Sequence, residues 1–289
     1  MTTTIFFKNL TPEQRRETAQ LPIGVFDSGV GGLTVLRAML RRMPGEDYLY
    51  LGDTARLPYG SKSRETIVRY SLQTTSQLVR QGIKLLVIAC NTATAAALPA
   101  LREACPDIPI IGVVEPGAQA ACQASSSGRI AVIATTSTIN GGAYRDAILR
   151  RRPDASVRSL PCPLFVPLAE EGWFDGPIVE SIAARYLTPL FAGKDDPDCL
   201  VLGCTHYPML ISAIRAVIGP VPLMVDSAAT TAEAVQERLD DEDMAHPQQQ
   251  DRTGVIRFFT TDDAGRFART GSLFLGMPIR EEDVRLVDL

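Results

Sequence analysis

The chain has 289 residues and a formal net charge of −4 at pH 7, with 45% hydrophobic and 21% charged residues. This length suits two modest domains, and the mildly acidic balance argues against a general nucleic-acid or membrane-surface binder. No apolar run approaches the roughly 20 residues that span a bilayer, and the N-terminus lacks the pattern of a secretory signal. We therefore expect a cytoplasmic protein with no nucleic-acid or membrane partner.

The first half of the chain alternates between strand and helix patterns. Thr11 to Gln14 form a capping-box pattern with proline at the first helical position, which predicts a short helix at 11–19. Apolar runs predict strands at 23–26, 47–51, 84–89 and 108–114, the last closed by a turn at Glu115-Pro116-Gly117. Helical periodicity follows the first three strands, at 33–43, 64–81 and 92–104. This alternation predicts a mainly parallel sheet with helices on both faces.

The second half repeats the scheme. Strands are predicted at 129–134, 199–203 and 223–225, and helices at 143–151, 177–191, 210–218 and 226–239. The polar stretch 240–253 is predicted to be a surface loop, and 255–260 a final strand. The fold class we predict is α/β, with two similar domains of mainly parallel sheets flanked by helices and an active site in the cleft between them. The expected division is an N-terminal extension at 1–20, a first domain at 21–115 plus 225–289, and a second at 116–224.

Two of the six cysteines lie in near-duplicate settings. Cys90 follows the apolar run of LVIACNT, and Cys204 follows that of LVLGCTH, one in each predicted domain. Ligands of open α/β sheets bind outside the carboxyl ends of the strands, and a helix N-terminus favours a thiolate. We therefore predict that both thiols are functional. The other four are predicted to be buried as small hydrophobes: Cys105, Cys122, Cys162 and Cys199.

Neither a disulfide framework nor a metal site is expected. The cysteines are sparse, no C-x-x-C pair occurs, and the only histidines are His206 and His246. A zinc site would need Cys204 and His206 together with ligands from distant parts of the chain. We therefore predict no metal.

The glycine cluster VFDSGVGGL joins the first strand to its helix, as a nucleotide-binding turn would. Thr34 stands where the dinucleotide fingerprint needs its third small residue, which argues against that cofactor. A turn whose backbone N–H groups, with Ser28, hold a small carboxylate fits the residues better. Asp27 could hold an ammonium group or orient a catalytic residue, and its other interpretation is a helix cap.

Five motifs carry a family resemblance: VFDSGVGGL, GDTARLPYGSKS, VIACNTATAAALPALR, ATTSTI and LVLGCTHYP. In type and order they resemble the motifs of the bacterial glutamate racemase family, within the cofactor-independent aspartate/glutamate racemases. The resemblance covers the chain from about Ile23 to its end. DTARLPYG and GCTHYP favour the glutamate branch over the aspartate branch.

The resemblance implies an isomerase that uses no pyridoxal phosphate, metal or nucleotide. One thiolate removes the Cα proton while the opposite thiol delivers a proton to the other face, so Cys90 would act on D-glutamate and Cys204 on L-glutamate. The positions that match the family's substrate contacts are Asp27, Ser28, Tyr59, Gly60, Asn91, Thr92, Thr205 and His206. Thr135, Thr136 and Thr138 are weaker candidates for carboxylate contacts. The implied role is to supply D-glutamate for peptidoglycan, and a homodimer is possible.

The chemistry explains these residue types. An amino-acid Cα–H is a far weaker acid than a thiol, whose ordinary pKa is about 8.5. A thiolate can remove that proton only if donors stabilise the charge developing at the carboxylate, and inversion without a cofactor needs two acid–base groups. His206 can assist Cys204, and Asp27 can do the same for Cys90. Two other functions stay open: an aspartate or hydantoin racemase, and a non-catalytic amino-acid-binding protein.

Overall fold

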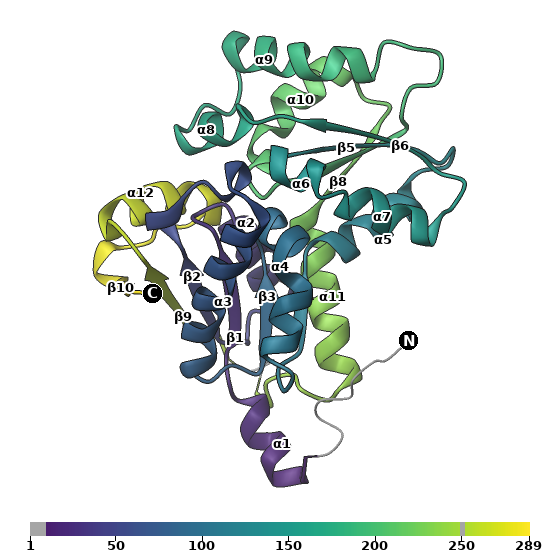
Figure 1. Cartoon of the computed structure of the whole chain (residues 1–289). Helices are drawn as coiled ribbons and strands as arrows, with labels where there is room; N and C mark the ends of the chain where they lie inside the picture. The colour runs from purple at the N-terminus through teal and green to yellow at the C-terminus, as the bar shows by residue number, and fades with distance from the viewer. Residues whose placement is uncertain (1–9, 249–251) are drawn as a thin grey trace.

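The computed structural model describes residues 10–248 and 252–289, which form two lobes, each built on a parallel sheet (Figure 1). Within this part of the chain the larger sheet has six strands in the order β10-β9-β2-β1-β3-β4. Its strands are β1 (Ile23–Asp27), β2 (Tyr48–Gly52), β3 (Leu85–Ile88), β4 (Ile110–Gly112), β9 (Ile256–Thr260) and β10 (Val284–Leu286). Strands β1, β2 and β3 are buried along their whole length, as expected for parallel strands covered on both faces.

Helices cover both faces of this sheet. One core contains residues of α2 (Leu33–Arg42), α11 (Ser227–Asp241) and α12 (Ala264–Leu275), and the other contains residues of α3 (Arg64–Arg80) and α4 (Asn91–Ala104). The sequence of α2 explains its place, because Leu33, Leu36 and Met39 recur at helical spacing on one face and are fully buried.

The smaller sheet has the strand order β6-β5-β7-β8, again with parallel pairs only. Its strands are β5 (Arg129–Ala134), β6 (Ser156–Pro161), β7 (Cys199–Gly203) and β8 (Leu223–Asp226). One core contains residues of α8 (Phe165–Glu170), α9 (Pro177–Leu187) and α10 (Ile211–Ile218), and the other contains residues of α5 (Val114–Ala124) and α7 (Ala143–Arg151). Short helices complete the described chain: α6 (Thr136–Asn140), η1 (Thr54–Arg56), η2 (Tyr59–Ser61), η3 (Thr188–Leu190), η4 (Tyr207–Leu210) and η5 (Glu281–Asp283).

The two sheets share one topology. The order β2-β1-β3-β4 in the first corresponds to β6-β5-β7-β8 in the second, and β9 and β10 extend the first sheet at one edge. The α/β class and the parallel sheets are therefore confirmed, including the strands predicted around both cysteines. The division into domains stays a prediction, and its boundary at residue 225 falls inside β8.

Three predictions of local structure were wrong. Glu115-Pro116-Gly117 lies inside helix α5 and is no turn, because proline in the first turn of a helix needs no N–H partner. Residues 240 and 241 belong to α11, and Met244, inside the predicted surface loop, is fully buried. Strand β10 follows the strand predicted to be final. Residues 249–251 of that loop lie outside the described residues.

The predicted N-terminal helix is present as α1 (Pro12–Ala19), with Thr11 and Gln14 forming the capping box. Its end is attached to the first lobe through Lys84, whose ammonium group donates to the Ala19 carbonyl at 2.8 Å and the Met244 carbonyl at 3.0 Å. Lys84 also forms an ion pair with Glu46 at 2.6 Å, in which both side chains are fully buried. Residues 1–9 of the predicted extension lie outside the described residues.

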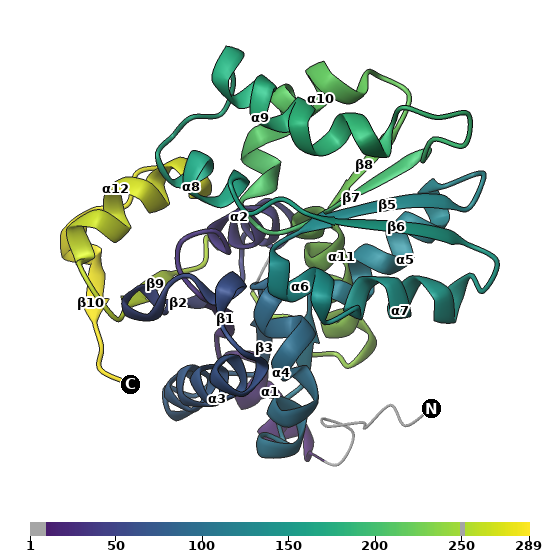
Figure 2. The same cartoon turned by 45° about the horizontal axis from the view of Figure 1, so that its top comes forward.

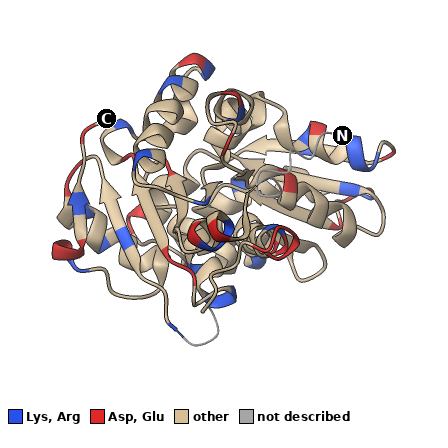
Figure 3. Ribbon diagram, turned by 90° about the horizontal axis from the view of Figure 1, so that it is seen from below, with Lys and Arg blue, Asp and Glu red and all other residues tan. Residues whose placement is uncertain are grey.

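The surface is mixed in charge. Seen from below, basic and acidic residues are interspersed over the helices and loops (Figure 3), in keeping with the small net charge. Within the described ranges, no helix is both long enough and apolar enough to cross a membrane.

Candidate active site

Cys90 and Cys204 occupy equivalent places in the two sheets. Cys90 follows β3 and is the N-cap of α4, whereas Cys204 follows β7 and precedes η4. In the larger sheet the chain passes from β1 to β2 on one side and then crosses to β3 on the other side of β1. In the smaller sheet it passes from β5 to β6 and then crosses to β7 in the same way, so the strand order reverses next to the strand that leads to each cysteine. That reversal leaves a crevice at the carboxyl ends of the strands, where α/β proteins bind ligands. Only 6% of each cysteine is exposed.

The Cys90 thiol is held in a desolvated setting. It donates to the Ser28 hydroxyl at 3.4 Å and accepts from the Ala93 N–H, also at 3.4 Å. Burial, followed by the negative charge of Asp27 and a smaller effect of Cys204, raises the pKa of Cys90 to about 12, although the hydrogen bonds with Ser28 and Ala93 oppose the rise. Cys90 is therefore a protonated thiol at neutral pH, able to donate a proton.

Asp27 lies beside this thiol with one carboxylate oxygen uncommitted. Its Oδ2 accepts from the Gly29 N–H at 2.9 Å, while Oδ1 is buried and has no hydrogen-bond partner among the described residues. Burial raises the pKa of Asp27, although His206 and backbone N–H groups oppose the rise. The helix-cap interpretation is wrong, because the N-cap of α2 is Gly32. The free oxygen is suited to an ammonium group or a proton.

Cys204 has a different partner, the imidazole of His206. The His206 Nδ1 atom lies 3.8 Å from the Cys204 sulfur, and Nε2 lies 3.1 Å from Oε1 of Glu170. Burial lowers the pKa of His206, but the contacts with Cys204 and Glu170 outweigh it and raise this pKa to about 10. The imidazole is therefore charged at neutral pH and can donate Nδ1–H to the sulfur.

Glu170 was not found by sequence reasoning. It ends α8, and its carboxylate also lies 3.9 Å from the guanidinium of Arg266 on α12. Helix α8 lies next to α12 in both views, so the two lobes meet here (Figures 1 and 2). Nothing in the local sequence distinguishes Glu170 from the adjacent Glu171, since only the tertiary contact with His206 sets it apart.

The glycine turn of the first lobe packs directly against the second lobe. A Cβ atom on Gly31 would overlap both Thr205 and His206, so only glycine fits there. The Thr34 hydroxyl lies 3.1 Å from the Thr205 carbonyl and 2.9 Å from that of Gly31, as donor to both. The turn brings Ser28 and Asp27 together with the Cys204 segment, and the charge of His206 acts on Asp27.

Tyr59 and Gly60 lie in η2, where the first lobe contacts the second. The Tyr59 hydroxyl donates to the buried carboxylate of Asp53, which also accepts from Arg56 and Thr261. Asp53 is thus committed within the protein, and its desolvation is offset by three donors. A Cβ on Gly60 would lie 2.8 Å from the Thr135 side chain, so η2 abuts the second lobe.

Three threonine hydroxyls form a hydrogen-bonded triangle between the lobes. The Oγ1 atom of Thr92 lies 2.9 Å from that of Thr135 and 3.1 Å from that of Thr138, and the last two are 3.0 Å apart. All three residues are buried, whereas Thr136 is exposed. The structure therefore brings together two of the three weaker candidates and leaves Thr136 at the surface.

Asn91 is also committed to protein contacts. Its Oδ1 atom accepts from the Tyr144 hydroxyl at 2.6 Å, and its Nδ2 atom donates to the Ser227 hydroxyl at 3.4 Å. Neither partner was found from the sequence. Tyr144 comes from α7 of the second lobe, so Asn91 joins the Cys90 segment to the other half of the molecule.

The remaining cysteines lie elsewhere. All six are free. Cys162 and Cys199 are buried as predicted, whereas Cys105 and Cys122 are only half-buried, so the predicted burial was wrong for these two. Burial raises the pKa of each of these four thiols, as it does for cysteines that act as small hydrophobes. Across residues 10–248 and 252–289, no three His, Cys, Asp or Glu side chains are grouped as a metal site would require.

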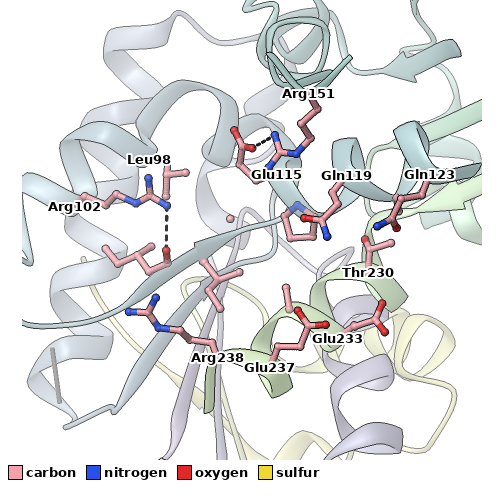
Figure 4. A pocket seen from close by; sticks show the side chains of 16 residues that line it. Leu98, Arg102, Glu115, Gln119, Gln123, Arg151, Thr230, Glu233, Glu237 and Arg238 are labelled. Carbon is pink, nitrogen blue, oxygen red and sulfur yellow. Dashed lines mark hydrogen bonds and ion pairs between the residues drawn. The ribbon is translucent and has the colours of Figure 1, made fainter. Parts of the chain in front are cut away.

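A separate groove of about 320 Å³ lies between α4, β4, α5 and α11 (Figure 4). Arginine and glutamate side chains from both lobes line it, including Arg102, Arg151, Glu233 and Glu237. None of the candidate site residues lines it, so it is distinct from the thiol site.

Each of the two α/β lobes thus brings one strand-end cysteine to a buried place, and the two thiols are near enough for a charge on Cys204 to raise the pKa of Cys90. The sequence model of the Asp/Glu/hydantoin racemase family matches residues 23–235. A glutamate racemase of Geobacter metallireducens is 49% identical over 254 residues, which cover 88% of this chain and 92% of the relative. The chain therefore belongs to the Asp/Glu/hydantoin racemase family, which confirms the resemblance seen in the sequence.

Solved structures agree with this assignment. A glutamate racemase from Francisella tularensis in complex with D-glutamate superposes with a TM-score of 0.85 at 35% identity, over 93% of this chain and 98% of that one. The Escherichia coli glutamate racemase in complex with L-glutamate and the activator UDP-MurNAc-Ala gives a TM-score of 0.72 at 29% identity, over 88% and 95% of the two chains.

Proposed function

We propose that this protein is a glutamate racemase that interconverts L- and D-glutamate with two cysteine thiols and no cofactor, and so supplies D-glutamate for peptidoglycan synthesis. The observation that carries the proposal is the placement of Cys90 and Cys204 at equivalent strand ends of two sheets, near enough for a charge on one thiol to affect the other, in a chain up to 49% identical to curated glutamate racemases.

In the proposed reaction, the thiolate of one cysteine removes the Cα proton of glutamate. The electron pair left on Cα is delocalised toward the carboxylate, and the thiol of the other cysteine then donates its proton to the opposite face. One proton is taken and one returned, so the net reaction is inversion at Cα. We assign Cys204 to the deprotonation of L-glutamate and Cys90 to that of D-glutamate.

The neighbours of the thiols have matching roles in this proposal. The uncommitted oxygen of Asp27 accepts from the substrate ammonium group. The hydroxyls of Ser28 and Thr205, together with backbone N–H groups of the turns that contain them, donate to the α-carboxylate, where negative charge develops. Thr92 and Gly60 lie at the contact between the lobes and contribute to the same pocket.

The two halves of the site differ in charge, which suits the two thiols to different roles. Burial and Asp27 raise the pKa of Cys90 to about 12, so Cys90 carries its proton at neutral pH. His206 is an imidazolium there, since its pKa is about 10, and it supports negative charge on Cys204. In the L-to-D direction, Cys204 would therefore act as the base beside the imidazolium, and the Cys90 thiol would deliver the proton to the other face.

The site is also closed. Asp27 is fully buried, and only 6% of either cysteine is exposed. Glutamate cannot reach these groups unless the lobes separate, and closure afterwards removes water from the thiols, as lid and domain movements do in other enzymes.

Incubation with L-glutamate in D2O tests the proposal, with the reaction followed by circular dichroism and Cα deuterium by mass spectrometry. We expect D-glutamate to form with deuterium at Cα, and both Cys90→Ala and Cys204→Ala to abolish inversion. Cys105→Ala is the matched control and should retain activity. Full racemisation by either single-thiol variant would contradict the two-thiol mechanism, and faster turnover of aspartate or hydantoins would reassign the substrate.

We further propose a cytoplasmic location, because six unpaired cysteines suit a reducing compartment. Light scattering on the purified protein would determine whether it is the homodimer that we regard as possible.

A further inference from the structure

Tyr144 contacts the immediate chain neighbours of both thiols. Its hydroxyl donates at 2.6 Å to Asn91, the residue after Cys90. Its ring lies against Gly203, the residue before Cys204, since a Cβ there would be 3.0 Å from the ring carbon Cε2. One side chain therefore touches the backbone segments that carry the two reacting groups, although those segments belong to different sheets.

The surroundings of Tyr144 leave it little freedom. Its exposed fraction is 2%, and it belongs to the apolar core between α5, α7 and the second sheet. On the other side of the ring is Gly117 of α5, where a Cβ would lie 3.2 Å from both Cε1 and the hydroxyl. The ring is thus enclosed between two glycines, and a larger residue at either position would displace it.

The hydroxyl is a fixed donor. Burial raises the pKa of Tyr144, and the neighbouring Cys204 and Asp226 raise it further, so the phenol stays protonated. Its proton goes to Asn91 Oδ1, which fixes the amide orientation and directs Nδ2 to the Ser227 hydroxyl. Asn91 is the first residue of α4, for which Cys90 is the N-cap, so restraining its side chain restrains the turn that presents the thiol.

We infer that Tyr144 is a positioning residue that sets the separation and orientation of the two thiols, with its ring against the Cys204 segment and its hydroxyl holding the Cys90 segment through Asn91. The inference rests on the proposed two-thiol racemisation. Proton transfer needs each sulfur atom close to the substrate Cα, one on each face and in line with the bond that breaks or forms. Small displacements of either thiol slow such a reaction steeply. A ring that served only to fill the core would not need its hydroxyl to donate to Asn91, the residue after Cys90.

The test compares Tyr144→Phe with Tyr48→Phe. Both substitutions remove one buried hydroxyl. That of Tyr48 donates to the Met39 and Met43 carbonyls, at 3.3 and 3.0 Å, and to no site residue among those the structure describes. Activity is followed by circular dichroism in both directions, with glutamate protonated or deuterated at Cα, and stability by urea unfolding.

For Tyr144→Phe we expect kcat to fall at least about tenfold in both directions, with a larger primary deuterium isotope effect on kcat because proton transfer becomes more rate-limiting. Tyr48→Phe should lose comparable stability and keep kcat within twofold, with an unchanged isotope effect. Gly117→Ala retains the hydroxyl but crowds the ring, and it should lower kcat in the same way, which provides a second variant if Tyr144→Phe folds poorly.

Two failures are distinguishable. If the wild-type protein does not racemise glutamate, the proposed function is overturned, and this inference with it. If the wild type is active and Tyr144→Phe keeps both kcat and the isotope effect of the wild type, this inference alone is overturned. A fall in kcat with no change in the isotope effect would equally contradict it, because a loss of folded enzyme gives that result.

Discussion

Glu170→Gln is the substitution that most directly probes the charge on His206. Glutamine keeps the shape of the side chain and can still accept from Nε2, but it removes the negative charge 3.1 Å from the ring. Coulomb's law with an effective dielectric constant near 20 gives about 5 kcal/mol for two unit charges at that distance. Glu170 is 18% exposed, so solvent screens part of this energy. We therefore expect the pKa of His206 to fall by at least about one unit, or about 1.4 kcal/mol.

The sign of the effect follows from the direction of the shift. The folded-state pKa of His206 is about 10, above its ordinary value of 6.5. The charged imidazole therefore stabilises the fold fully below about pH 6.5, and this contribution is lost as the pH rises through about 10. In Glu170→Gln the loss should begin at lower pH, and so should the loss of support for negative charge on Cys204.

The assay is the pH profile of kcat/KM for L-glutamate, measured by circular dichroism between about pH 6 and pH 11, with thermal unfolding over the same range. The alkaline limb should move at least about one unit toward lower pH in Glu170→Gln. Glu171→Gln is the matched control, because it makes the same change at the exposed neighbour. An alkaline limb that coincides with that of the wild type, in a folded variant, would refute the assignment of Glu170 as the partner that keeps His206 charged.

Two further predictions concern other contacts. Lys84→Met should lower the free energy of unfolding, measured in urea, by about 3–5 kcal/mol, because it leaves the buried carboxylate of Glu46 without its cation. Adding Glu46→Gln should recover part of that loss. If the losses of the two single variants simply add in the double variant, the two residues are not coupled. The Cβ added by Gly31→Ala would overlap Thr205 and His206, so this substitution should lower kcat about a hundredfold. The far-ultraviolet circular dichroism should change little, and an unaltered kcat would show that this turn does not position the site.

Much of the fold could be predicted because its signals are local. The short apolar runs that became β3 and β7 are each followed by a cysteine and then by helical periodicity, and the structure has these strands within a residue or two of the expected bounds. The capping box of α1 is equally local. Where predictions failed, tertiary packing overrode composition. Met244 lies in a polar stretch, yet it is buried, and its carbonyl accepts from Lys84.

The partners of the site residues could not be predicted in the same way. His206 follows Cys204 by two positions, so its contact with that thiol could be expected from the sequence. Glu170 is 36 positions from His206, and the sequence does not distinguish it from Glu171. Tyr144 is 53 positions from Asn91 and belongs to a helix with no motif. Side chains reach such partners only once the sheets and their crossing helices are packed.

The sequence by itself determined the α/β class, the family and the two thiols, because each is encoded in a few adjacent residues: an apolar strand, a cysteine and a helix start. Only the tertiary structure decided what stands beside each thiol. Burial and the charge of Asp27 keep Cys90 protonated, while the imidazolium of His206, supported by Glu170, places positive charge beside Cys204. The physical reason is that burial and charge act through space, so two similar cysteine motifs acquire different electrostatic surroundings when the lobes fold around them.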